Sequence, residues 1–254
     1  MRTISVVTAV HSGAVGFLPE ALASLDAQVL PNGWAWEWCV QEDGPETNAA
    51  RHLRDDPRIR IGTSRKGGPG VARTMAFARS RGEYIRNLDA DDQFPSGALC
   101  RDIEALETHP DIGWTTSSVI DLMEDGSHGK FDLGDPSPGA MSRGSAFEYW
   151  KTRYRPQVHP ATLCVRRQLL ALLGGWMAVP ASEDTGLLLS LDAISQGFFT
   201  DEVGLIYRKH PGQITRDPAH GQGPEWEARM ALIIERVQAL RQWTSASLDE
   251  ATGD

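Results

Sequence analysis

The chain has 254 residues, of which 41% are hydrophobic and 23% charged, and its formal net charge is −9. That length is enough to bury the core of one domain, or of one domain with an appendage. The negative charge, without any run of Lys and Arg, argues against binding to a nucleic-acid backbone. No apolar stretch approaches the roughly 20 residues that are needed to span a bilayer.

The cysteines indicate the compartment. Cys39, Cys100 and Cys164 are odd in number and widely spaced, which is typical of a reducing environment rather than of a disulfide framework. The opening MRTISVVTAVHSG is typical of a first strand rather than of a signal peptide. We therefore expect a cytoplasmic protein without stable membrane association.

Short β-rich runs alternate with helix-like segments in the first half of the sequence. Leu18, Leu22 and Leu25, for example, repeat at helical spacing directly after the opening strand. In chain order, the patterns predict strands at 3–10, 36–40, 58–62, 83–89 and 113–120, and helices at 18–28, 68–82 and 95–109. This alternation predicts an α/β fold with a mainly parallel sheet and helices on both faces.

The second half is less regular. Residues 121–144 are polar and rich in Gly and Pro, so we expect a long, mobile surface loop. The following patterns predict strands at 161–167 and 201–210, helices at 168–175, 182–197 and 224–243, and a frayed tail at 244–254. Ser182 is the expected N-cap of its helix. There is no repeat and no clear domain break, so 1–254 is expected to form a single domain.

An acidic cluster follows the strand expected at 83–89. In YIRNLDADDQF, Asp89, Asp91 and Asp92 occupy three of four positions directly after an apolar run. Ligands of an open parallel sheet bind beyond the carboxyl ends of its strands. The aspartates could cap a turn and the next helix. Clustered like charges are costly without a cation, however, so the pattern favours a Mg²⁺ or Mn²⁺ site that faces a diphosphate.

With these segments in place, the chain resembles family 2 of the GT-A-fold glycosyltransferases over nearly its whole length. The resemblance is carried, in order, by ISVVTAVHSG with LPEALASLDAQ, WCVQEDGPET, GGPGVARTMAFARSRGEYIRNLDADD with its Asp-x-Asp motif, GGWMAVPASEDTGLLLSL, and LIYRKHPGQIT. It implies a GT-A (nucleotide-diphospho-sugar transferase) fold, with a mixed, mainly parallel sheet flanked by helices. Residues 1–120 would form the nucleotide-binding half, 121–223 the acceptor or sugar side, and 224–243 a C-terminal helix.

The resemblance also implies a nucleotide site and a metal site. The residues that would bind the nucleotide are Thr8, Ala9, Asp43, Arg73 and Asp89. Asp91 would be the direct ligand of Mn²⁺ or Mg²⁺, with Asp89 and His210 completing the site. Taken alone, Asp43 could sit in a simple turn, Arg73 on a helix surface and His210 in an ordinary loop.

The catalytic residues implied by the resemblance are Asp184, Glu183 and His159. Asp184 would be the general base that takes a proton from the acceptor hydroxyl. Glu183 and Asp184 could also simply offset the positive charge at the N-terminal end of a helix dipole. This structural role is compatible with the catalytic one. His159 could contact the sugar or the acceptor, or be structural.

Three functions remain open on the sequence. The first is a metal-dependent glycosyltransferase that moves a sugar from a nucleotide-diphospho-sugar to a small soluble acceptor. The second is a nucleotide-sugar isomerase of the pyranose–furanose mutase type, and the third an inactive nucleotide-sugar-binding protein. Thr8-Ala9-Val10-His11 stands where the family usually has Pro-Thr-Tyr-Asn, so UDP, GDP and dTDP are all open as the nucleotide. A homodimer is possible through the C-terminal helix.

Overall fold

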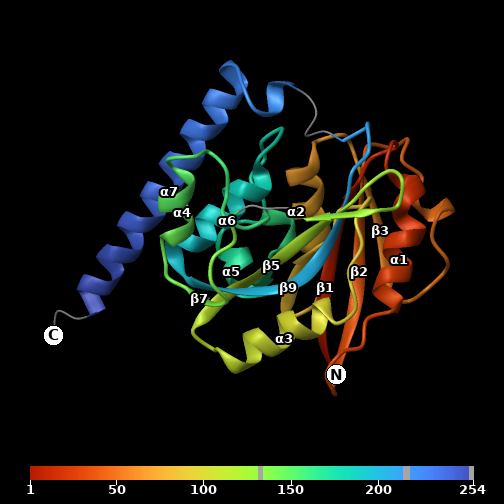
Figure 1. The fold of residues 1–254 in the computed structure, drawn as a ribbon, viewed down its shortest axis with the longest axis horizontal. Coiled ribbons are helices and arrows are strands. Elements are labelled where there is room, and N and C mark those ends of the chain that lie inside the picture. The colour runs from red at the N-terminus through yellow and green to blue at the C-terminus, as the bar shows by residue number, and fades with distance from the viewer. Residues whose placement is uncertain (131–133, 214–217, 252–254) are drawn as a thin grey trace.

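A computed structural model of the protein describes residues 1–130, 134–213 and 218–251 (Figure 1). Within them, nine strands form one sheet in the order β3-β2-β1-β4-β8-β5-β9-β7, with β6 paired to β5. The strands are β1 (Arg2–Val10), β2 (Trp34–Asp43), β3 (Ile59–Ser64), β4 (Tyr84–Asn87), β5 (Ile112–Leu122), β6 (His128–Lys130), β7 (Gly139–Met141), β8 (Cys164–Arg166) and β9 (Gln196–Arg208).

Helices lie on both faces of this sheet (Figure 1). The α-helices are α1 (Leu18–Asp26), α2 (Pro69–Arg79), α3 (Ala98–Thr108), α4 (Ser145–Trp150), α5 (Arg167–Leu172), α6 (Glu183–Ile194) and α7 (Pro224–Ala251). Short 3₁₀ helices are η1 (Val15–Phe17), η2 (Ala49–Arg51), η3 (Pro160–Thr162) and η5 (Pro218–His220).

The sheet is mixed but mainly parallel, as predicted. β1 pairs in parallel with β2 and β4, β2 with β3, and β5 with β9. β8 is antiparallel to both of its neighbours, β4 and β5. β8 comes from the second half of the sequence, but it lies in the sheet between β4 and β5, two strands of the first half.

The side chains of β1 pack into two separate hydrophobic cores, one on each face of the sheet. Ile4 and Val6 belong to the core under α1 and α3, which includes Leu25 and Leu99. Val7 belongs to the core on the opposite face, under α2, α6 and α7. Because both faces of the strand are covered, its residues are buried continuously from Ile4 to Thr8 rather than in alternation.

The C-terminal helix is longer than predicted. α7 has 28 residues and continues to Ala251 through the segment expected to fray. Met230, Ile233 and Val237 are buried in the core that α7 shares with α6, and the helix then runs out beyond the sheet (Figure 1). None of the described helices combines the length and the apolar character needed to cross a membrane.

The prediction of one long loop at 121–144 is wrong in part. β5 continues to Leu122 and returns through a turn at Gly126, where φ is 81°, into β6. β7 then pairs with the beginning of β9. Each of these two strands has three residues, too few for an alternating pattern to reveal them. The stretch 131–133 of that segment falls outside the described residues.

Ser182 is the N-cap residue of α6, as predicted, but it makes no capping hydrogen bond with its side chain. Its backbone is in the left-handed region, with φ of 61°. Its hydroxyl instead accepts a hydrogen bond from Arg229 Nη1 of α7 at 2.7 Å. A tertiary contact with α7 thus replaces the local cap at the start of α6.

Candidate active site

The centre of the site is Arg73, a buried arginine on α2. Its Nη2 lies 2.5 Å from Asp89 Oδ1, just beyond the end of β4. Its Nη1 is bonded to Glu183 at the start of α6. The side chains of Arg73 and Glu183 are 7% and 6% exposed, so little water screens this pair. One guanidinium therefore joins the two halves of the predicted site.

A glycine brings these elements together. A Cβ on Gly70 would lie 2.1 Å from the carbonyl oxygen of Met177 and 3.0 Å from Glu183 Cβ. Only glycine lets α2 approach the start of α6 so closely. Arg73, three residues further along α2, then reaches Glu183 directly.

Burial and charge act against each other on this ion pair. Burial alone would lower the pKa of Arg73, but Asp89, Glu183 and Asp184 outweigh it and hold that pKa above its ordinary value. Burial would raise the pKa of Asp89, but Arg73 outweighs it and holds the pKa below its usual value. Burial raises the pKa of Glu183 to about 7, against the pull of Arg73, and Asp184 adds to the rise. Glu183 thus titrates near neutral pH.

Asp91 and His210 form the second part of the site. Asp91 Oδ2 lies 2.8 Å from His210 Nε2, and the two side chains are 21% and 18% exposed. The ring of Phe17 lies against His210, with the centroids 5.2 Å apart. The pair is assembled and partly open to solvent.

Asp92 has a different environment from Asp91. It is 1% exposed, and its Oδ1 accepts the backbone N–H of Arg208 at 2.9 Å. Burial, together with the charges of Asp91 and Asp89, raises the pKa of Asp92 well above its ordinary value. Asp92 was predicted to belong to the acidic cluster, but no role was predicted for it.

Two of the predicted nucleotide residues are engaged within the protein. Thr8 is fully buried. Its hydroxyl donates to Leu88 O at 2.6 Å and accepts from Trp38 Nε1 at 2.8 Å. Asp43 accepts the N–H groups of Gly67 and Gly68, at 2.6 Å and 3.1 Å, and so holds the loop before α2. Ala9 follows Thr8 on β1 and is half-buried.

The three predicted catalytic residues differ in how their side chains are held by partners within the protein. Glu183 is committed to Arg73, whereas Asp184 is half-buried and its Oδ1 accepts the N–H of Thr185 at 2.6 Å. His159 Nδ1 accepts the N–H of Ala161 at 3.3 Å, so in the neutral ring the proton sits on Nε2. Burial lowers the pKa of His159, although the charges of Asp184 and Asp89 act to raise it. His159 is therefore suited to donate a hydrogen bond.

The donor set suits a divalent cation only in part. Asp91 Oδ2 and His210 Nε2 are hydrogen-bonded to each other at 2.8 Å, so a cation would bind there in place of that hydrogen bond. The carboxylate oxygen suits Mg²⁺ or Mn²⁺. Asp89 is bonded to Arg73 and Asn87 rather than to this pair. Over the described ranges, no three His, Cys, Asp or Glu side chains converge as a metal-binding group. Mg²⁺ and Mn²⁺ sites of this kind take further ligands from water and substrate phosphate.

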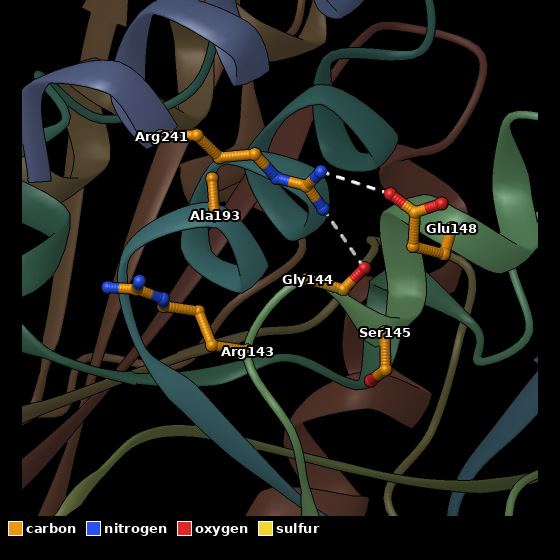
Figure 2. A pocket seen from close by; sticks show the side chains of 6 residues that line it. All are labelled: Arg143, Gly144, Ser145, Glu148, Ala193 and Arg241. Atoms are coloured by element: carbon orange, nitrogen blue, oxygen red, sulfur yellow. Dashed lines mark hydrogen bonds and ion pairs between the residues drawn. The ribbon is translucent and has the colours of Figure 1, made fainter. Parts of the chain in front are cut away.

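A separate pocket of about 430 Å³ lies away from these residues. It is lined by Arg143, Gly144, Ser145, Glu148, Ala193 and Arg241 (Figure 2). Arg241 donates to Glu148 Oε1 at 3.0 Å and to Gly144 O at 3.1 Å (Figure 2). Its guanidinium thus braces α4 against α7, which gives the arginine a structural role.

Comparison with known proteins identifies the family. Residues 5–159 match the family described as Glycosyl transferase family 2. This is more than half of the chain, and the chain therefore belongs to family 2 of the glycosyl transferases. Glu183, Asp184 and His210 lie beyond the matched residues.

The chain spans only part of the curated relatives that it matches, less than half of each. The chain is 31% identical over 180 residues, 68% of its length, to O-antigen biosynthesis protein RfbC of Myxococcus xanthus, and spans 13% of that protein. An uncharacterized glycosyltransferase of Methanocaldococcus jannaschii is 28% identical over 130 residues, which are 49% of this chain and 44% of the relative.

Solved structures confirm the predicted GT-A fold. TarS of S. aureus in complex with UDP-GlcNAc aligns with a TM-score of 0.72 at 17% identity, over 93% of this chain and 66% of the TarS chain. The UDP complex of TarS aligns with a TM-score of 0.67 at 16% identity, over 93% and 65%.

Proposed function

We propose that the protein is a metal-dependent glycosyltransferase that moves a sugar from a nucleotide-diphospho-sugar to a hydroxyl of a small-molecule acceptor. The observation that carries this proposal is the Arg73 bridge. It ties Asp89, beyond β4, to Glu183 at the start of α6, the residue next to the candidate base Asp184. Family membership and the fold shared with TarS, which was solved with UDP-GlcNAc and with UDP, support a nucleotide-sugar donor.

The donor diphosphate is proposed to lie at Asp91 and His210. These two residues would hold Mn²⁺ or Mg²⁺, and the cation would offset the negative charge that develops on the departing diphosphate. The partial exposure of both side chains, 21% and 18%, leaves room for ligands from outside the protein. UDP is the first nucleotide to test, with GDP as the comparison.

Asp184 is the proposed general base. Of the three predicted catalytic residues, Glu183 is held by Arg73, and neutral His159 carries its proton on Nε2. Asp184 is a half-buried carboxylate at the same helix start. It would take the proton of the acceptor hydroxyl as that oxygen attacks the sugar. Arg73 keeps Glu183 in place beside it, so catalysis would depend on positioning as well as on proton transfer.

The first test is to incubate the protein with Mn²⁺ or Mg²⁺ and a panel of UDP-, GDP- and dTDP-sugars without acceptor, followed by NMR. Slow release of free sugar and nucleotide from one donor, dependent on the cation, is expected. That donor is then offered with hydroxyl-bearing acceptors, and a new glycoside is expected. A new nucleotide sugar of unchanged mass would instead establish a mutase.

The matched variant for this test is Asp184→Asn, which keeps the shape of the side chain but cannot accept the proton. It should bind the donor as the wild type does and glycosylate the acceptor far more slowly. If Asp184→Asn transfers sugar at the wild-type rate, Asp184 is not the base.

A further inference from the structure

The loop after β4 is fastened to the end of β9 by its backbone. Gln93 and Ile206 exchange two hydrogen bonds, from Gln93 N to Ile206 O at 3.1 Å and from Ile206 N to Gln93 O at 2.9 Å. These residues lie just after Asp91 and just before His210. The two segments that carry the pair are therefore held side by side before any ligand arrives.

Asp92 and Arg208 add two more hydrogen bonds at the same place. Asp92 Oδ1 accepts the backbone N–H of Arg208 at 2.9 Å, and Arg208 Nε donates to the backbone oxygen of Asp91 at 2.8 Å. The bonds run in opposite directions between the two segments, so together they fix both the spacing and the register. Asp91 is adjacent to Asp92, and His210 is two residues from Arg208.

The other contacts of Arg208 reach the N-terminal part of the site. Its Nη2 is bonded to Glu20 of α1, and its guanidinium carbon lies 4.9 Å from the centre of the Phe17 ring. Phe17 in turn lies against His210. Arg208 is thus held from three sides, which gives Asp92 a rigid partner.

We propose that Asp92 is a positioning residue that sets the geometry of the Asp91–His210 pair, and through it the affinity for the cation of the donor diphosphate. At 1% exposure Asp92 cannot itself reach a ligand in the site. Its part is to anchor the N–H of Arg208, since that bond is, of the four described above, one of the two nearest to His210, and its loss loosens the chain on which His210 lies. The functional consequence rests on the proposed metal-dependent transfer, whereas the structural one does not.

The test compares Asp92→Ala with Asp92→Asn. Asparagine keeps an oxygen that can accept from Arg208 N–H, so Asp92→Asn should bind Mn²⁺ as the wild type does. Alanine removes the acceptor, and Mn²⁺ affinity measured by electron paramagnetic resonance should fall roughly 10- to 100-fold, as for other residues that orient metal ligands. In crystals of Asp92→Ala, the distance from Asp91 Oδ2 to His210 Nε2 should increase from 2.8 Å to beyond about 3.5 Å.

The matched control is Asp192→Ala on α6. Asp192 is also fully buried and its carboxylate also accepts backbone N–H groups, those of Ala146 and Phe147 at 3.2 Å and 3.0 Å. It should lose stability without any change in Mn²⁺ affinity. If it weakens Mn²⁺ binding as much as Asp92→Ala does, the effect is general destabilisation and the proposal fails.

Two further results would overturn the proposal. Asp92→Ala could keep the Asp91–His210 pair at hydrogen-bonding distance with wild-type Mn²⁺ affinity. Alternatively, Asp92→Asn could lose as much affinity as Asp92→Ala, which would make the charge of Asp92 the active feature. A wild type that binds no Mn²⁺ would refute the metal-dependent function instead, and the crystal distance would still decide the role of Asp92.

Discussion

Asp91 and His210 are 119 residues apart in the chain and lie 2.8 Å from each other, Oδ2 to Nε2. If they hold the cation, Asp91→Asn and His210→Ala should each lower cation-dependent turnover of the donor by roughly 100-fold or more, because the leaving diphosphate loses its charge partner. The measurement is donor hydrolysis at saturating Mn²⁺. His52→Ala, at an exposed histidine, is the control and should leave the rate unchanged. A His210→Ala protein as active as His52→Ala would remove His210 from the site.

Arg73 should contribute more to stability than a surface arginine with the same number of partners. Arg73→Lys cannot reach both carboxylates, and the buried charge left without a partner should cost about 3 kcal/mol in the free energy of unfolding by urea. Arg2 also bonds two carboxylates, Glu83 and Glu107, but its side chain is 42% exposed. Arg2→Lys should cost less than about 1 kcal/mol. Equal losses would mean that burial of the Arg73 bridge has no energetic consequence.

Substitutions of Asp184 and of His159 should have different effects on kcat. Asp184→Asn should lower kcat by roughly 10²–10⁴-fold, as expected for a lost general base, while the Kd for the donor is unchanged. His159→Gln retains a hydrogen-bond donor and should alter kcat much less. The comparison is made by acceptor glycosylation and by calorimetric titration of the donor. The reverse order of effects would assign the proton transfer to His159.

Glu183 should make stability depend on pH. The folded protein raises the pKa of Glu183 from an ordinary 4.5 to about 7, chiefly because the carboxyl is buried. The folded state therefore binds the proton more tightly than the unfolded state. This contribution is fully present below about pH 4.5 and is lost as the pH rises through about 7.

Urea unfolding at pH 5 and pH 7.5 measures this effect. The decrease in unfolding free energy between the two should be smaller in Glu183→Gln than in the wild type, because glutamine does not titrate. The pKa of Asp192 is raised to about 6, mainly by burial, and this group is common to both proteins. Its effect therefore cancels in the comparison. An identical pH dependence in both proteins would contradict the raised pKa of Glu183.

Thr8 should matter for folding rather than for direct nucleotide contact. Thr8→Val leaves Trp38 Nε1 without its acceptor and Leu88 O without its hydroxyl donor, which should cost about 1–3 kcal/mol in unfolding free energy. Thr8→Ser restores the hydroxyl and should recover most of the loss. Nucleotide affinity should be unchanged in both folded variants. A nucleotide affinity that falls with stability unchanged would favour the role implied by the family resemblance.

Much of the fold could be predicted from the sequence, but for β8 and β9 the residue pattern did not predict the position in the sheet or the first residue of the strand. β8 has only three residues, and no sequence signal places it between β4 and β5. β9 begins at Gln196, earlier than the predicted 201. The register of β5 and β9 shifts at Ser117 and Ser118, opposite the exposed residues Asp201 and Glu202. A bulge of this kind interrupts the alternation on which strand prediction depends.

The candidate site could be predicted by residue type but not by partner. The sequence singled out Arg73, Asp89 and Glu183 separately, yet nothing local indicates that one guanidinium binds both carboxylates. Gly70 could have indicated the contact between α2 and α6, because a glycine inside a helix often marks the close approach of another segment. Asp92 was missed as an individual residue, since its partner is a backbone N–H of a distant strand.

The position of β8 in the sheet has a consequence for the order in which the protein is made. Domains fold from the N-terminus as they are synthesised, and β4 is complete long before β8 exists. Until β8 emerges, one edge of β4 is unpaired and open to contact with other chains. At that stage Arg73 also has Asp89 but not Glu183. The newly made first half therefore exposes a strand edge that only β8, from the second half, covers.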